Sequence, residues 1–143
     1  MDRQDSPPLL TALARRIENP SDAGQVAVSV VNIWREINAS LTPVLGERGV
    51  AEIYKRSLSL TTDYPWLMRM QQDVKGFIDL DALSRGLRAQ SSGEACAAAR
   101  ALLESFYTLL TTLIGTTLTE RLLRSVGTDS TEEINPSPQD PSS

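Results

Sequence analysis

The sequence predicts an all-α fold, a compact bundle of five to six helices, and three observations support this. Apolar residues recur every three or four positions through most of the chain, which is the period of an amphipathic helix. Capping residues, prolines and glycines divide these stretches into segments of ordinary helix length. The alternation of apolar and polar residues that is typical of strands is nearly absent.

The first two helices are delimited by prolines and a capping pair. Ser6-Pro7-Pro8 suits a helix start, and Asn19-Pro20 should end that helix, because the residue before proline avoids helical dihedral angles. Asp22 and Gln25 have the spacing of a capping box, so the next helix is expected over about 23–45. Its apolar residues have the three-and-four spacing of a packing seam: Ala27, Val30, Trp34, Ile37, Leu41 and Val44.

A break should follow this long helix. Pro43 removes one helical hydrogen bond and should kink or end the helix, and Gly46 can adopt the backbone conformation of the turn. A third helix is expected over 47–61. A short helix should follow at about 66–74.

The second half of the chain repeats these signals. Further helices are expected over 80–90, 93–114 and 118–126. The predicted caps are Asp79, the pair Ser91 and Glu94, and the pair Thr117 and Glu120. A second seam contains Ala95, Ala99, Leu102, Phe106, Leu109 and Leu113.

Two segments share a pattern that we interpret as two αα-hairpins of similar design. Residues 41–46 and 110–115 both read Leu-Thr-x-aliphatic-aliphatic-Gly. Chance is the alternative, since helical sequences are rich in Leu, Arg and Glu. If one residue is omitted after the glycine, three more positions match: Glu52, Arg56 and Ser57 with Glu120, Arg124 and Ser125.

The composition predicts a single helical domain over residues 1–127, followed by a disordered acidic Ser/Pro-rich tail over 128–143. The tail contains four acidic residues and no basic one, so it accounts for the whole formal net charge of -4. It has too little apolar surface to offset the entropy cost of ordering. The remaining residues carry equal numbers of acids and bases, which argues against nucleic acid as a partner.

The residue inventory excludes several chemistries. The chain has no histidine and one cysteine, which rules out Ser-His-Asp and Cys-His catalysis and metal sites built from these residues. An enzyme that uses only Asp, Glu, Arg, Ser or Tyr is compatible with this inventory, but no pattern in the sequence supports one, so we predict no catalytic residue, no metal site and no cofactor. No apolar run is long enough to cross a membrane, the N-terminus lacks signal-peptide features, and Cys96 has no partner, so we expect a cytoplasmic location.

Residues 64–70, between the helices expected over 47–61 and 80–90, are the candidate interaction surface. They include two aromatic residues and two methionines within seven positions, and such side chains are enriched at protein interfaces. The alternative is a loop that closes the end of the bundle, with its tryptophan as a lid. The candidate residues are Tyr64, Trp66, Leu67, Met68 and Met70.

A ligand pocket between the two long helices is the competing hypothesis. It would bind a small apolar or anionic molecule near Trp34 and Phe106, with Arg35 or Arg56 as the charge partner. The simpler interpretation of Trp34 is a core residue, because it lies on the apolar seam.

The sequence thus favours a non-enzymatic protein–protein interaction or regulatory module, with a homodimer or another protein as its partner. A small-ligand sensor is the alternative. A DNA-binding helix-turn-helix over 80–114 is favoured less, because the leading turn of its second helix, residues 94–99, contains no Arg, Asn, Gln or Lys to contact base edges.

Overall fold

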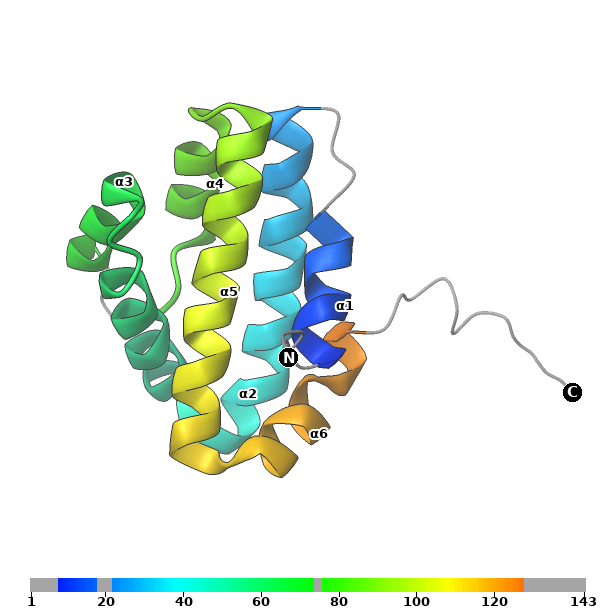
Figure 1. Ribbon diagram of the computed structural model, residues 1–143. Helices are drawn as coiled ribbons and strands as arrows, with labels where there is room; N and C mark the ends of the chain where they lie inside the picture. Colours follow the sequence, from blue (N-terminus) through cyan, green and yellow to red (C-terminus); the bar gives the residue numbers. More distant parts are fainter. Residues whose placement is uncertain (1–7, 18–21, 74–75, 128–143) are drawn as a thin grey trace, which may run out of the picture.

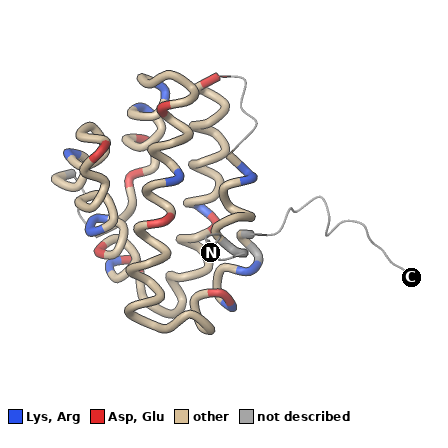
Figure 2. The backbone as a smooth tube through the Cα atoms, in the orientation of Figure 1, with Lys and Arg blue, Asp and Glu red and all other residues tan. Residues whose placement is uncertain are grey.

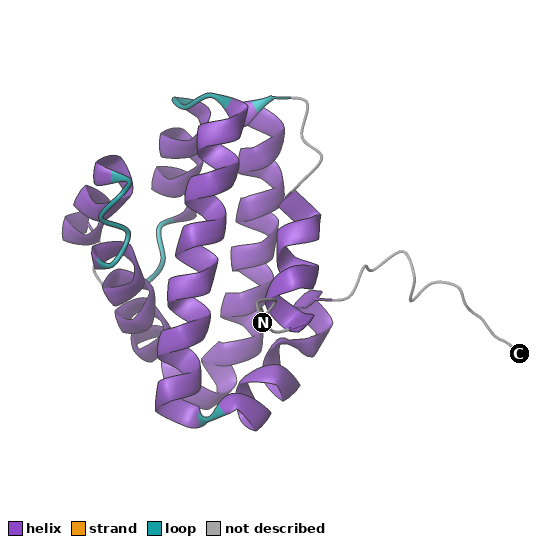
Figure 3. Ribbon diagram, in the orientation of Figure 1, coloured by secondary structure: helices purple, strands orange, loops and turns teal. Residues whose placement is uncertain are grey.

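The computed structural model describes residues 8–17, 22–73 and 76–127 of the chain. These residues form an all-α bundle (Figures 1 and 3), and no strand occurs within the described ranges. The predicted tail over 128–143, the Ser6 cap and the Asn19-Pro20 stop lie outside them. The helices are α1 (Pro8–Ile17), α2 (Ala23–Ser59), α3 (Pro65–Arg69), the 3-10 helix η1 (Met70–Asp73), α4 (Leu80–Arg88), α5 (Ser92–Ile114) and α6 (Thr116–Gly127).

Side-chain caps fix the starts of three helices, as the sequence predicts. The Asp22 carboxylate accepts a hydrogen bond from the backbone N–H of Gln25 at 2.9 Å, at the start of α2. Asp79 accepts from Ala82 at 3.1 Å at the start of α4. Ser91 Oγ accepts the amide of Glu94 at 3.1 Å at the start of α5. Each cap satisfies a donor that the helix itself leaves without a partner.

The helix α2 contains a break that divides it into two segments. At Gly46 the backbone angles are φ 80° and ψ 156°, far from helical values and in a region that only glycine adopts readily. We call residues 23–45 the first segment and residues 47–59 the second segment. The prediction that Pro43 kinks or ends the helix is wrong in position, because the helix passes through Pro43 and is interrupted at the permissive glycine.

The first segment of α2 and α5 form the centre of the bundle, as predicted for the two long helices. They run side by side in the same direction (Figure 1), and residues from both make up much of the core. The chain then departs to opposite sides of this pair. The second segment of α2 lies on one side with α3 and α4, and α6 lies on the other with α1.

Both predicted seams are wrong in their last turn. Val44 is 51% exposed and Leu113 is 62% exposed, although both were expected to be core residues. The buried residue near the end of α5 is Leu110, not Leu109 or Leu113. A straight helix has 3.6 residues per turn, so a strict seven-residue repeat drifts away from the buried face over several turns.

The bundle is built from two similar three-helix units. The first consists of α1 and both segments of α2, and the second consists of α4, α5 and α6. The first segment of α2 and the helix α5 are both 23 residues long and have a capping residue 69 positions apart. Each ends at a glycine with the same conformation, since Gly115 has φ 89° and ψ 156°.

Burial follows the same pattern in both units without a gap. Positions 69 residues apart are buried together on both sides of the glycine: Val30 and Ala99, Ile33 and Leu102, Ile37 and Phe106, Leu41 and Leu110, Val50 and Thr119, and Tyr54 and Leu123. The matching of Glu52 with Glu120, which needed one omitted residue, is therefore wrong. The position equivalent to Glu52 is Arg121, and both are exposed.

The predicted capping box at Thr117 and Glu120 is also wrong. The helix α6 already begins at Thr116, directly after Gly115. The Glu120 carboxylate accepts a hydrogen bond from the Tyr107 hydroxyl at 3.1 Å, which links α6 to α5. A capping pattern is short and common in helical sequences, so it does not by itself locate a helix start.

One arginine connects three helices at the side formed by α1 and α6. Arg16 donates two hydrogen bonds of 2.9 Å to the Glu36 carboxylate on α2 and one of 2.7 Å to the carbonyl of Val126 near the end of α6. Its planar guanidinium suits this forked arrangement. In the described part of the chain, no helix is long and apolar enough to cross a membrane.

Candidate functional site

The predicted pocket near Trp34 and Phe106 is filled by the aromatic rings themselves. The Trp34 and Phe106 rings meet edge-on at 4.8 Å between centroids, and Trp34 meets Tyr54 at 5.1 Å in a similar way. All three side chains are buried. Arg35 is exposed on the first segment of α2, and Arg56 lies on the second segment. The structure therefore does not bring these four predicted residues around one cavity.

Two polar atoms of this aromatic cluster and one of Trp66 lack partners. Among the described residues, the Trp34 Nε1, the Tyr54 hydroxyl and the Trp66 Nε1 are buried without a hydrogen bond. Burial raises the pKa of Tyr54 well above its ordinary value, and the negative charge of Asp79 adds to this rise. The hydroxyl therefore stays protonated, and its burial costs stability.

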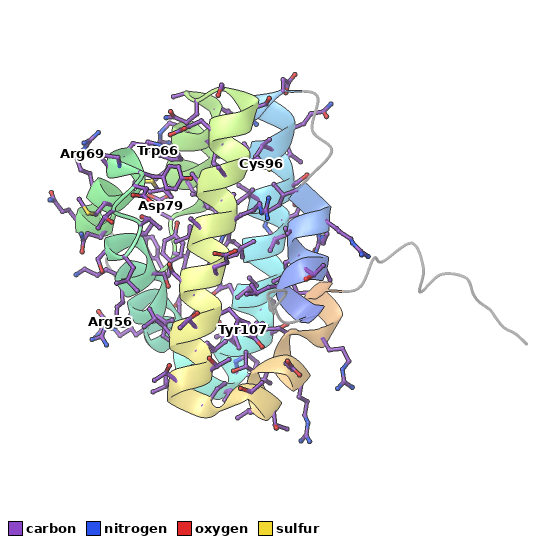
Figure 4. All side chains as sticks on the ribbon, in the orientation of Figure 1. Arg56, Trp66, Arg69, Asp79, Cys96 and Tyr107 are labelled. Atoms are coloured by element: carbon purple, nitrogen blue, oxygen red, sulfur yellow. The ribbon has the colours of Figure 1, made fainter. Side chains whose placement is uncertain are left out.

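The predicted interaction surface over Tyr64–Met70 faces largely inward. The Leu67 side chain is fully buried, so this residue offers no surface to a partner. Tyr64, Trp66, Met68 and Met70 are half-buried, and three of them pack against the core. Figure 4 shows Trp66 between α3 and α4, with Arg69 pointing away from the bundle.

Trp66 rests on the backbone of α4 because residue 86 is a glycine. A Cβ placed on Gly86 would lie only 2.8 Å from Cζ3 of the Trp66 ring. The Sδ atom of Met70 would lie 3.6 Å from the same added Cβ. This close fit agrees with the alternative interpretation of the segment as a lid on the bundle.

An open groove lies instead between the second segment of α2 and the last turns of α5. Its volume is about 400 Å³. Apolar side chains of Ile53, Leu109 and Leu113 form much of its wall, and the exposed Glu52 and Arg56 lie on its rim. The full set of lining residues is Gly49, Glu52, Ile53, Arg56, Leu109, Thr112 and Leu113.

Gly49 is one of the residues that line the groove, and it adds no side chain to it. The equivalent position in the second unit, three residues after the other glycine break, is Leu118, which is half-buried. A Cβ on Gly49 would meet only the Cβ of Leu45, at 3.3 Å, so the space beside this glycine is open toward the groove. The first unit thus has no side chain at the position where the second unit has a leucine.

The charges on the rim are balanced. Glu52 and Arg56 lie one helical turn apart, and neither side chain makes an ion pair or hydrogen bond within the described part of the chain. Figure 4 shows Arg56 projecting outward from the second segment of α2. Acidic and basic residues are mixed over the bundle in the view of Figure 2, so this view shows no broad face of one charge.

Of the residues that line this groove, the sequence predicted only Arg56 as a site residue. Sequence reasoning assigned Leu109 and Leu113 to the packing seam, used Glu52 only in the comparison of the two segments, and gave no role to Gly49. The available signal was the ungapped match at 69 positions, which aligns Gly49 with Leu118 and marks a missing side chain. Omitting a residue in the comparison concealed that difference.

Other reactive groups in the described residues do not converge. Cys96 is a half-buried free thiol near the start of α5, and its Sγ lies 3.8 Å from the carbonyl oxygen of Ile17. The described ranges contain no group of three or more acidic or sulfur ligands placed to hold a metal ion.

Comparisons of the chain with models of known families, with curated proteins and with solved structures found no match.

Proposed function

We propose that this protein is a non-enzymatic protein–protein interaction or regulatory module that associates with itself. The observation that carries the proposal is the groove between the second segment of α2 and α5. Exposed apolar side chains are costly to leave in water, and Leu113, on the wall of the groove, is 62% exposed beside the half-buried Leu109. Here they are combined with a charged rim at Glu52 and Arg56, the arrangement of a protein interface with an apolar centre.

Light scattering of the full chain across a dilution series tests the proposal. We expect a mass of twice 15.6 kDa at high concentration that falls toward the monomer mass on dilution. A monomer mass at every concentration up to about 1 mM would reject self-association, because specific protein complexes weaker than this contribute little binding energy.

The same groove supports a small-molecule sensor as a second candidate. A volume of about 400 Å³ lies within the range of small-ligand pockets, and Arg56 offers a charge partner for an anionic group. The candidate ligand is an apolar carboxylate with its chain along Ile53 and Leu109. Thermal unfolding with decanoate as the probe tests this: stabilisation that is lost in Arg56→Gln supports it, and no stabilisation rejects this ligand class.

We also propose that the module acts in the cytoplasm. A single unpaired cysteine, Cys96, suits a reducing compartment. Localisation of a fluorescently tagged chain in the source cell is the test, and export of the chain would reject it.

A further inference from the structure

The groove carries opposite charges on its rim and uncharged side chains between them. An interface between identical chains related by a two-fold axis brings the same patch of both copies together, so that residue i of one meets residue j of the other in two places. Such a patch needs opposite charges that exchange across the axis and a central region without charge. The lining of the groove provides both features.

The charges occupy the required positions. Glu52 and Arg56 are both exposed and lie four residues apart on one helix, with the apolar Ile53 between them. If two copies of the second segment of α2 lie antiparallel across a two-fold axis near Ile53, each Glu52 faces the Arg56 of the second copy. Two equivalent ion pairs then form, and neither Glu52 nor Arg56 loses an existing side-chain interaction with the described residues.

The apolar residues and the glycine fit the same arrangement. Leu109 and Leu113 on α5 are also four residues apart, so an axis that also crosses α5 midway between them brings the Leu109 of one copy over the Leu113 of the other. Leu113, at 62% exposure, becomes covered. Gly49 has no side chain above the helix backbone, which permits the second copy to approach closely.

We propose that a second copy of this chain covers the groove, in a two-fold dimer whose two Glu52–Arg56 pairs flank a centre of Ile53, Leu109 and Leu113. This inference rests on the proposed self-association and adds its symmetry and the pairing of its charges. The second unit has no such surface of its own, since its equivalent of Gly49 is Leu118 and its equivalent of Glu52 is Arg121.

Charge exchange in the full chain tests the symmetry directly. Glu52→Arg places Arg against Arg in both pairs of its homodimer, and Arg56→Glu places Glu against Glu in the same way. We expect each variant to dimerise at least about tenfold more weakly than the wild type, since attraction becomes repulsion at two contacts. An equimolar mixture of the two variants should form a heterodimer with opposite charges at both pairs and regain most of the lost affinity.

Arg121→Glu is the matched control for Arg56→Glu, because it makes the same change of charge on an exposed site of α6 outside the groove. It should dimerise like the wild type. Sedimentation equilibrium of the wild type, the three variants and the mixture provides the measurement. A monomeric wild type overturns both proposals. A wild-type dimer that is unaffected by Glu52→Arg and Arg56→Glu, or not recovered in the mixture, overturns this interface and leaves self-association standing.

Discussion

Substitution of Gly86 by alanine should lower the stability of the fold, because the single added carbon would clash with the Trp66 ring. In Gly86→Ala the new Cβ would lie 2.8 Å from Cζ3 and 3.0 Å from Cε3 of Trp66, and both atoms belong to a rigid ring. Such distances are well below van der Waals contact, so the ring or the helix must move. Overpacking of this kind costs about 1 to 3 kcal/mol.

The clash is partly offset by the intrinsic preference of alanine for helices, which is worth about 1 kcal/mol over glycine. We therefore expect a net loss of about 1 kcal/mol in the free energy of unfolding for Gly86→Ala. Gly93→Ala is the matched control, because it also lies in a helix and a Cβ there meets nothing within 4 Å. It should leave stability unchanged or slightly increased.

Urea unfolding followed by circular dichroism measures the difference between the two alanine variants. Repeating both in a Trp66→Leu background removes the ring and should abolish most of the difference, as expected for residues in direct contact. If Gly86→Ala is as stable as Gly93→Ala in the presence of Trp66, the ring does not rest on α4. The interpretation of Tyr64–Met70 as an inward-packed lid would then be refuted.

Three further substitutions test other parts of the structure. Gly115→Ala should cost about 1 to 3 kcal/mol of unfolding free energy through backbone strain alone, since its φ is 89° and nothing lies near the added carbon; urea unfolding equal to wild type would contradict this. Burial raises the pKa of Tyr54 above 10.0, so above pH 10 the unfolded chain loses this proton first and stability should fall with pH by at most about 1.4 kcal/mol per unit. Tyr54→Phe should reduce this fall and gain up to about 1 kcal/mol near neutral pH, where a buried hydroxyl without a partner is removed; thermal unfolding at pH 7 and pH 11 shows whether it does. Arg16→Lys should lose about 1 kcal/mol, because an ammonium cannot make the forked contact with Glu36 and also reach Val126, and hydrogen exchange near the end of α6 should then become faster.

Most of the helical architecture could be predicted because its signals are local. The caps at Asp22, Asp79 and Ser91 and the glycine breaks at Gly46 and Gly115 depend on residues within one turn of each other. Spacing also identified the buried faces of the long helices over most of their length. It failed at Val44 and Leu113, where the seven-residue repeat has drifted away from the buried face of the helix.

The candidate site could not be predicted in the same way, because it results from a missing side chain and from the relative placement of two helices. No local sequence pattern marks Gly49. The missing side chain is recognised only when Gly49 is compared with Leu118, its equivalent in the other unit. The sequence placed Arg56 near Trp34, although the fold turns Arg56 outward and fills the space around Trp34 with Tyr54 and Phe106. Composition can suggest an aromatic interface, but only packing determines which face such side chains occupy.

The most direct test of the central claim, that the groove is the surface through which the chain associates with itself, is hydrogen–deuterium exchange of the full chain at two concentrations. Both lie within the dilution series, one far above and one far below the dimer's dissociation constant. Residues 49–56 and 109–113 should exchange more slowly at the higher concentration, because they become covered in the dimer, while residues 64–70 should not change. Protection confined to 64–70, or equal exchange in the groove at both concentrations of a chain that does dimerise, would contradict the account.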